Sequence, residues 1–289
     1  MEETKRNNQT KNVLIELIAV LFLASAGIFV RRSTLSPINT GLWRMIFALP
    51  FLFILAFKDL KKISGKDIIL SIFSGIFLAG DLVFFNLALV NTSMANTNLF
   101  TNLTAFIIVP VSHFVFKEQI SKNYLIGLFI TLAGVVLLVL GKNSPSSSNY
   151  IGDLCAVGAC IFYSFYMLTT YRLRDRLESS VILFIGAFGT IIALLIVCGI
   201  REGLQYPKTL GEFLNLLLFA ICMQVIGQNL LAYCQGKISI NLSIAITLLQ
   251  PGIAAIYSFL FFGEKLTIME LCGMAVVVTG VYICKRQFS

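Results

Sequence analysis

The sequence predicts an all-α integral membrane protein, with ten transmembrane helices arranged as two inverted five-helix repeats. Of its 289 residues, 57% are hydrophobic and only 12% are charged, an apolar share above the roughly 45–50% of soluble domains. The apolar residues form runs of about 20, long enough to cross the hydrocarbon core as helices. No run alternates polar and apolar residues as a barrel strand does, so we expect helices.

The first span is expected at residues 12–30. It imitates a secretory signal, because Lys11 precedes an apolar run that contains the small residues 24–26. However, Glu16 interrupts the run and its apolar residues continue to Val30, so we expect the segment to be retained as a span. The other nine spans are expected at residues 38–57, 67–90, 95–116, 123–141, 150–171, 179–199, 213–235, 241–262 and 267–284.

Lysine and arginine indicate the expected sidedness of the chain. Fifteen of the 22 lie in the termini and in every second connection, six lie in the remaining connections, and Arg44 lies inside a span. Because cytoplasmic segments carry the excess of these residues, we expect a multi-pass protein of the cell membrane, inner or cytoplasmic, with both termini in the cytoplasm. The basic residues form no tract with interleaved aromatics, so no nucleic-acid partner is expected despite the net charge of +8.

A polar stretch at residues 141–149 divides the chain almost in half, and the two halves end alike. The segment FKEQISKNYLIGLFITLAGVVL at 116–137 aligns with FGEKLTIMELCGMAVVVTGVYI at 262–283, an offset of 146. We therefore predict two five-helix repeats, at residues 1–141 and 150–289. Since five is odd, the second repeat enters the membrane in the opposite sense, as in many secondary transporters.

The two closing segments also predict local structure. Ser121 and Thr267 are placed to cap the helix that follows each, and Thr267 with Glu270 fits a capping box. Glycines recur seven residues apart on one helix face, where small residues allow two helices to approach closely. We expect a structural role for these glycines, which are Gly127 and Gly134 in the first half and Gly273 and Gly280 in the second.

These features resemble the drug/metabolite transporter superfamily, in its EamA-type branch. The resemblance covers essentially the whole chain and rests on the pattern E-x-[IL]-[ST]-x5-G-x6-G, which starts at Glu118 and again at Glu264, and on Arg44 in the second span. The chain departs from the family where Ala105 replaces a proline that would match Pro251, and no arginine in the seventh span matches Arg44. The resemblance implies transport of small organic solutes.

Asp81 is the candidate that the apolar pattern least explains. A charge at the middle of a membrane helix costs roughly 2.5–3.5 kcal/mol, so such residues face the bundle interior or a wet cavity. Arg44 and Asp81 are expected at depths that differ by only about 5 Å, at 1.5 Å per residue. One interpretation is a salt bridge that holds spans 2 and 3 together; the other is that Asp81 lines a cavity and binds a substrate amine or carries a proton.

Further polar and aromatic residues are expected near mid-membrane, each with packing against a neighbouring helix as its alternative role. Span 6 carries a semi-polar stripe at helical spacing, and Gln250 precedes a proline that weakens the helical hydrogen bonding of span 9. With Arg44 and Asp81, the candidate substrate-binding residues are Phe85, Asn86, Thr101, Tyr163, Tyr166, Gln228 and Gln250.

The favoured function is secondary active transport of a small organic metabolite by alternating access, with export of amino acids or related amines as the first hypothesis. Uptake of a nucleoside-like cofactor or another metabolite is the alternative, and a membrane-embedded enzyme or a channel is a remote one. No phosphate-binding GxxxxGK[ST] loop occurs, so a gradient is expected to drive transport. We expect a small solute, the lipid bilayer and protons as partners, and neither a cofactor, a metal nor catalysis.

Overall fold

The structure is a computed structural model, which describes residues 2–60, 63–92, 94–141 and 150–286. The polar stretch at residues 141–149 lies outside the described residues except for Gly141. The helices are α1 (Glu2–Ala24), α2 (Ala26–Arg32), α3 (Pro37–Ala56), α4 (Gly65–Asn91), α5 (Met94–Asn102), α6 (Thr104–Val115), α7 (Lys122–Gly141), α8 (Tyr150–Leu173), α9 (Ser179–Arg201), α10 (Leu210–Phe219), the π-helix η2 (Ala220–Gln228), α11 (Asn229–Gln235), α12 (Ile240–Thr247), α13 (Gln250–Phe262) and α14 (Ile268–Arg286).

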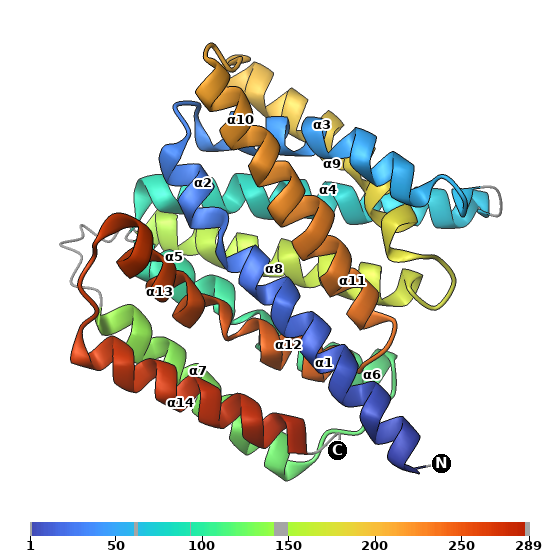
Figure 1. The fold of residues 1–289 in the computed structure, drawn as a ribbon, viewed down its shortest axis with the longest axis vertical. Helices are drawn as coiled ribbons and strands as arrows, with labels where there is room; N and C mark the ends of the chain where they lie inside the picture. The colour runs from blue at the N-terminus through green and yellow to red at the C-terminus, as the bar shows by residue number, and fades with distance from the viewer. Residues whose placement is uncertain (1, 61–62, 93, 142–149, 287–289) are drawn as a thin grey trace.

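The helices confirm the predicted class of an all-α membrane protein with ten spans. Within the described residues, nine helical segments are long and apolar enough to cross a membrane, and a shorter apolar segment, Leu99–Val115, lies at the place of the fourth span. Figure 1 shows these segments packed as one bundle, with their connections gathered at its two ends.

Two of the spans, predicted as continuous helices, are broken near their middles. The fourth span divides into α5 and α6 at Leu103, and the ninth divides into α12 and α13 at Leu248 and Leu249. Under the offset of 146, Leu103 corresponds to Leu249, so the breaks fall at equivalent positions. Only the second break has a proline beside it, because Pro251 corresponds to Ala105. A proline is therefore not required for the break.

Helices α7 and α14 lie side by side in Figure 1 and approach to backbone contact. A Cβ atom added to Gly134 would lie 2.9 Å from the carbonyl oxygen of Gly273, and one added to Gly127 would lie 2.9 Å from that of Gly280. The contacts are reciprocal, because Gly127 corresponds to Gly273 and Gly134 to Gly280. Such reciprocal contacts are those expected of two helices related by a two-fold axis. The predicted structural role of the glycines is confirmed.

The turns before α7 and α14 also match. The backbone amide of Tyr124 donates to the Ser121 hydroxyl at 3.1 Å, and Thr267 and Glu270 form the predicted capping box, with amide-to-side-chain distances of 2.8 and 3.1 Å. Lys117 has a φ of 56° and Gly263, at the corresponding position, a φ of 66°. The left-handed turn is thus kept even where a lysine occupies it.

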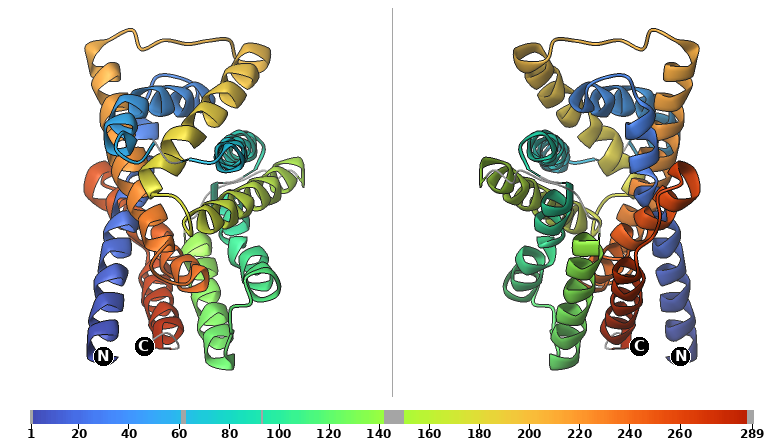
Figure 2. Two further views of the ribbon diagram at one scale, coloured as in Figure 1. Left: turned by 90° about the vertical axis from the view of Figure 1, so that its right-hand side faces the viewer. Right: turned by 90° about the vertical axis from the view of Figure 1, so that its left-hand side faces the viewer.

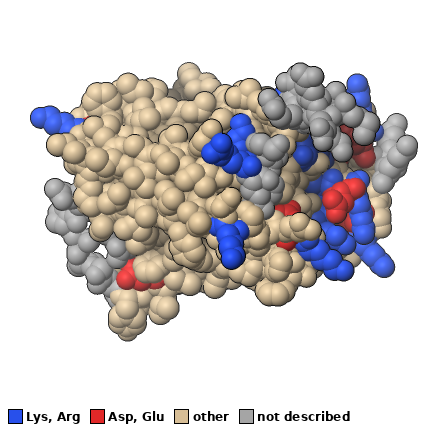
Figure 3. Space-filling model, turned by 90° about the horizontal axis from the view of Figure 1, so that it is seen from below, with Lys and Arg blue, Asp and Glu red and all other residues tan. Residues whose placement is uncertain are grey.

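The described chain begins and ends at the same end of the bundle (Figure 2). On the face shown in Figure 3, most Lys and Arg gather on one side, and the opposite side is mostly uncharged. A broad uncharged surface with the basic residues gathered on one side suits a protein surrounded by lipid.

Candidate functional site

The candidate site is a group of buried polar side chains in the interior of the bundle, and Arg44 is its cation. Arg44 comes from α3 and is only 2% exposed. Its guanidinium lies 5.2 Å from the ring centroid of Phe219, and its Nη1 contacts the Met223 sulfur at 3.0 Å. Its Nε is buried and has no hydrogen-bond partner in the described part of the chain, so Arg44 keeps a donor for another group.

Asp81 of α4 lies in the same region. It interacts electrostatically with Arg44, yet in the described residues no Arg44 nitrogen lies within 4.0 Å of an Asp81 oxygen. Asp81 is half-buried. The structure therefore brings the two residues together without closing a direct salt bridge between them.

The aromatic stripe of α8 faces the same interior. The Tyr166 hydroxyl donates to Gln228 Oε1 at 3.1 Å. The two tyrosine rings lie 5.9 Å apart, centroid to centroid. Tyr163 is close enough to Asp81 and to Glu16 to interact with both electrostatically.

Three residues outside the predicted set also carry buried polar atoms. Glu16 of α1 is fully buried, and one of its oxygens accepts a hydrogen bond from the Ser243 hydroxyl of α12. Its other oxygen, both side-chain polar atoms of Gln224 and the Asn229 Oδ1 are buried without partners in the described residues. Leaving a buried polar group unpaired costs about 1–3 kcal/mol, so these atoms indicate a place where a further hydrogen-bonding group belongs.

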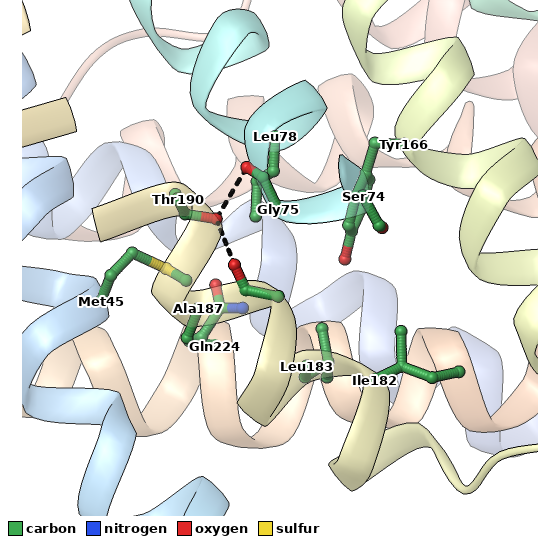
Figure 4. Close-up of a pocket in the computed structure, with 11 residues that line it drawn as sticks. Met45, Ser74, Gly75, Leu78, Tyr166, Ile182, Leu183, Ala187, Thr190 and Gln224 are labelled. Carbon is green, nitrogen blue, oxygen red and sulfur yellow. Dashed lines mark hydrogen bonds between the residues drawn. The ribbon is translucent and has the colours of Figure 1, made fainter. Parts of the chain in front are cut away.

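A pocket lies beside this group and reaches Gln224 (Figure 4). Met45, Ser74, Tyr166, Thr190 and Gln224 are among its lining residues, and its cavity volume is about 10 Å³. A volume of about 10–15 Å³ is needed to hold one water molecule, whereas ligand pockets commonly start at about 300 Å³. Binding of an organic solute would therefore require the helices to move apart.

The other predicted residues are less closely joined to this group. The Thr101 hydroxyl donates to the Thr97 carbonyl of its own helix at 3.0 Å. Gln250 begins α13 directly after the break and is half-buried, as are Phe85 and Asn86 on α4. Within the described residues, no hydrogen bond or ion pair connects Phe85, Asn86 or Gln250 to Arg44 or Asp81.

A bundle of ten apolar spans around a buried polar interior is the architecture of a multi-pass membrane transporter. The chain belongs to the EamA-like transporter family, whose model matches it twice, at residues 10–140 and at 150–285. The predicted family is thereby confirmed.

Several relatives are similar over most of their length. An uncharacterized transporter of Clostridium kluyveri is 22% identical, over 94% of this chain and 92% of its own. The uncharacterized transporter YetK of Bacillus subtilis is 22% identical, over 93% and 85%. A probable amino-acid metabolite efflux pump of Salmonella typhimurium is 20% identical, over 62% and 63%. A solved crystal structure shares the fold, with a TM-score of 0.80 at 17% identity over 97% of this chain and 99% of the other.

Proposed function

We propose that this protein is a secondary active transporter that exports amino acids or related amines by alternating access. One observation carries the proposal: buried polar atoms of Glu16, Arg44, Gln224 and Asn229 lack partners in the described interior. In a transporter of this architecture the substrate site lies in the bundle interior, between the two repeats. A polar solute would supply the missing hydrogen bonds.

The charges in this interior favour a zwitterion or an amine. Arg44 offers a donor to a carboxylate, and Glu16 and Asp81 offer acceptors to an ammonium group. The amides of Gln224 and Asn229 add neutral acceptors. A nucleoside-like cofactor, the alternative substrate, would leave the two carboxylates without a cation.

The rings of Tyr163 and Tyr166 suit the apolar part of such a substrate. The two rings lie 5.9 Å apart on α8, and the Tyr166 hydroxyl is held by Gln228. An aromatic wall with a few fixed polar groups is typical of small-molecule sites. This arrangement supports substrates that carry an apolar side chain.

The broken spans support alternating access. Transporters place interrupted helices near the membrane midplane, where half-helices bend as the site changes sides. Breaks at Leu103 and Leu249 occupy corresponding positions of the two halves, so each half contains a joint of the same kind. With the predicted cytoplasmic termini, the chain would open alternately to the cytoplasm and to the outside.

The proposal is tested first by ligand binding. Purified protein is screened by thermal unfolding against amino acids, amines, nucleosides and cofactors, because a ligand that prefers the folded state raises the unfolding temperature. We expect stabilisation by amines or amino acids. Stabilisation by nucleosides alone would support the uptake alternative.

The second test is transport by the full chain in proteoliposomes. The ligand identified above should show counterflow without nucleotide, and flux that requires ATP hydrolysis by this chain would contradict a secondary mechanism. Asp81→Asn should abolish or alter transport while the protein remains folded. If transport and its pH profile survive and only stability falls, Asp81 serves packing.

A further inference from the structure

A hydrogen-bonded cluster around Glu118 joins helices of both halves at one end of the bundle. Glu118 follows α6 and accepts from the Tyr171 hydroxyl of α8 at 2.8 Å and from the Asn241 side chain of α12 at 2.6 Å. It also accepts from the Ile240 backbone amide at 3.3 Å. One carboxylate thus holds the end of α6 against α8 and α12.

Asn241 extends this cluster into the core. It is fully buried, its side-chain oxygen accepts from the Ser112 hydroxyl at 2.9 Å, and its carbonyl accepts from the Tyr124 hydroxyl at 2.8 Å. The side-chain hydrogen bonds of Glu118 and Asn241 all join different helices. The ends of these helices cannot separate unless the bonds to Glu118 break.

Glu264 occupies the corresponding position at the other end. It follows α13, as Glu118 follows α6, and the same left-handed turn precedes each glutamate, at Gly263 and at Lys117. Glu264 forms an ion pair with Arg31 of α2, and the Arg31 guanidinium lies 4.9 Å from the ring centroid of Phe262. The side chains of this pair are 35% and 39% exposed, unlike the buried Asn241.

We propose that Glu118 and Glu264 are the latches of two opposite gates, which means that the contacts of each glutamate hold one end of the bundle closed. The contacts of Glu118 form the stronger latch. The inference rests on the alternating-access function proposed above. Opening either end requires one latch to release while the other holds. Exposed ion pairs are weak because water screens them, whereas charge-assisted hydrogen bonds at half-buried sites are stronger. The protein therefore opens more readily at the Arg31–Glu264 end.

Hydrogen–deuterium exchange of the full chain in nanodiscs tests this without any substrate. Tyr171→Phe removes one hydroxyl from the Glu118 latch and keeps the ring contact with Phe116, while Glu118→Gln removes the charge. Both variants should speed exchange about tenfold at the Glu118 end, in residues 236–243, and further along α8 in residues 164–173. Exchange at residues 263–271 should stay unchanged.

Arg31→Gln is the matched variant at the other end. It should speed exchange at residues 263–271 by about threefold or less, because its ion pair is exposed, and leave residues 236–243 unchanged. If Glu118→Gln does not fold, Tyr171→Phe decides the matter.

Three results would overturn the proposal: equal changes at both ends in every variant, no change with Tyr171→Phe, or a larger effect of Arg31→Gln than of the Glu118-end variants. Failure of the transport proposal is a separate outcome, since it appears as absent counterflow in the unmodified protein.

Discussion

The contact between α7 and α14 and the interior around Arg44 differ in how completely their groups are satisfied. Along α7 and α14, glycines bring the two backbones together, and the Thr131 hydroxyl donates within its own helix to Gly127 at 2.8 Å. Around Arg44, several buried polar atoms have no partner in the described residues. The polar groups of the first region are paired within the fold, whereas the second region keeps unpaired hydrogen-bonding groups that the proposed substrate would contact, at some cost in stability.

The largest expected effect is at the α7–α14 contact. In Gly134→Leu, the new side chain would begin 2.6 Å from the backbone nitrogen of Val277, so we expect a loss of about 3 kcal/mol or more, or failure to fold. Thermal unfolding and gel filtration measure this. Gly199→Ala is the control, because nothing lies within 4 Å of a Cβ there. Normal stability of Gly134→Leu would show that the contact is not tight.

The next effect separates binding from folding at Arg44. Arg44→Gln removes the buried cation, and we expect binding of a zwitterionic ligand to weaken at least about tenfold, which corresponds to about 1.4 kcal/mol. Amines without a carboxylate should lose less. Thermal-shift titration with a matched amino acid and amine measures the difference. Equal losses for both ligands would mean that Arg44 does not contact a carboxylate.

Gln224→Leu should act in opposite directions on stability and transport. Its side-chain amide is buried and unpaired in the described structure, so an apolar replacement should raise the stability of the ligand-free protein by about 1 kcal/mol. Proteoliposome counterflow should fall at the same time. Lower stability would indicate that Gln224 already has a hydrogen-bonding partner, such as an internal water.

The smallest effect is expected for Pro251→Ala. The break in the fourth span occurs with Ala105 at the corresponding position, so the break in the ninth span should persist, with a change in stability below about 1 kcal/mol. Thermal unfolding and counterflow measure the two consequences. Abolished transport in a stable variant would mean that the proline itself is needed for movement.

Much of the α7–α14 contact could be predicted from the sequence. Glycines seven residues apart mark one face of a helix whatever surrounds it, and a Ser or Thr cap acts on amides only three residues away. The contacts of Gly127 and Gly134 and the capping box at Thr267 therefore followed from local spacing. Their reciprocity across the two-fold axis required the structure.

The interior was less predictable, because helical periodicity assumes a regular helix. Residues Ala220–Gln228 form a π-helix, in which hydrogen bonds run from i to i+5 and side chains turn differently. Gln228 and Asn229 are adjacent in the sequence, and both carry buried polar atoms. Glu16 was visible as the charge interrupting an apolar run, but its place beside Ser243 depends on a contact between residues 227 positions apart.

The reciprocal contact of α7 and α14 bears on which conformation the protein prefers when no substrate is bound. If the two halves exchange geometries during the transport cycle, the backbone of the inward-open state mirrors that of the outward-open state. The backbone alone then gives neither state a lower free energy. The preference must then arise where corresponding positions carry different side chains, as at Lys117 and Gly263 or Ala105 and Pro251. A few substitutions at such positions would change the end at which the substrate-free protein is open at rest.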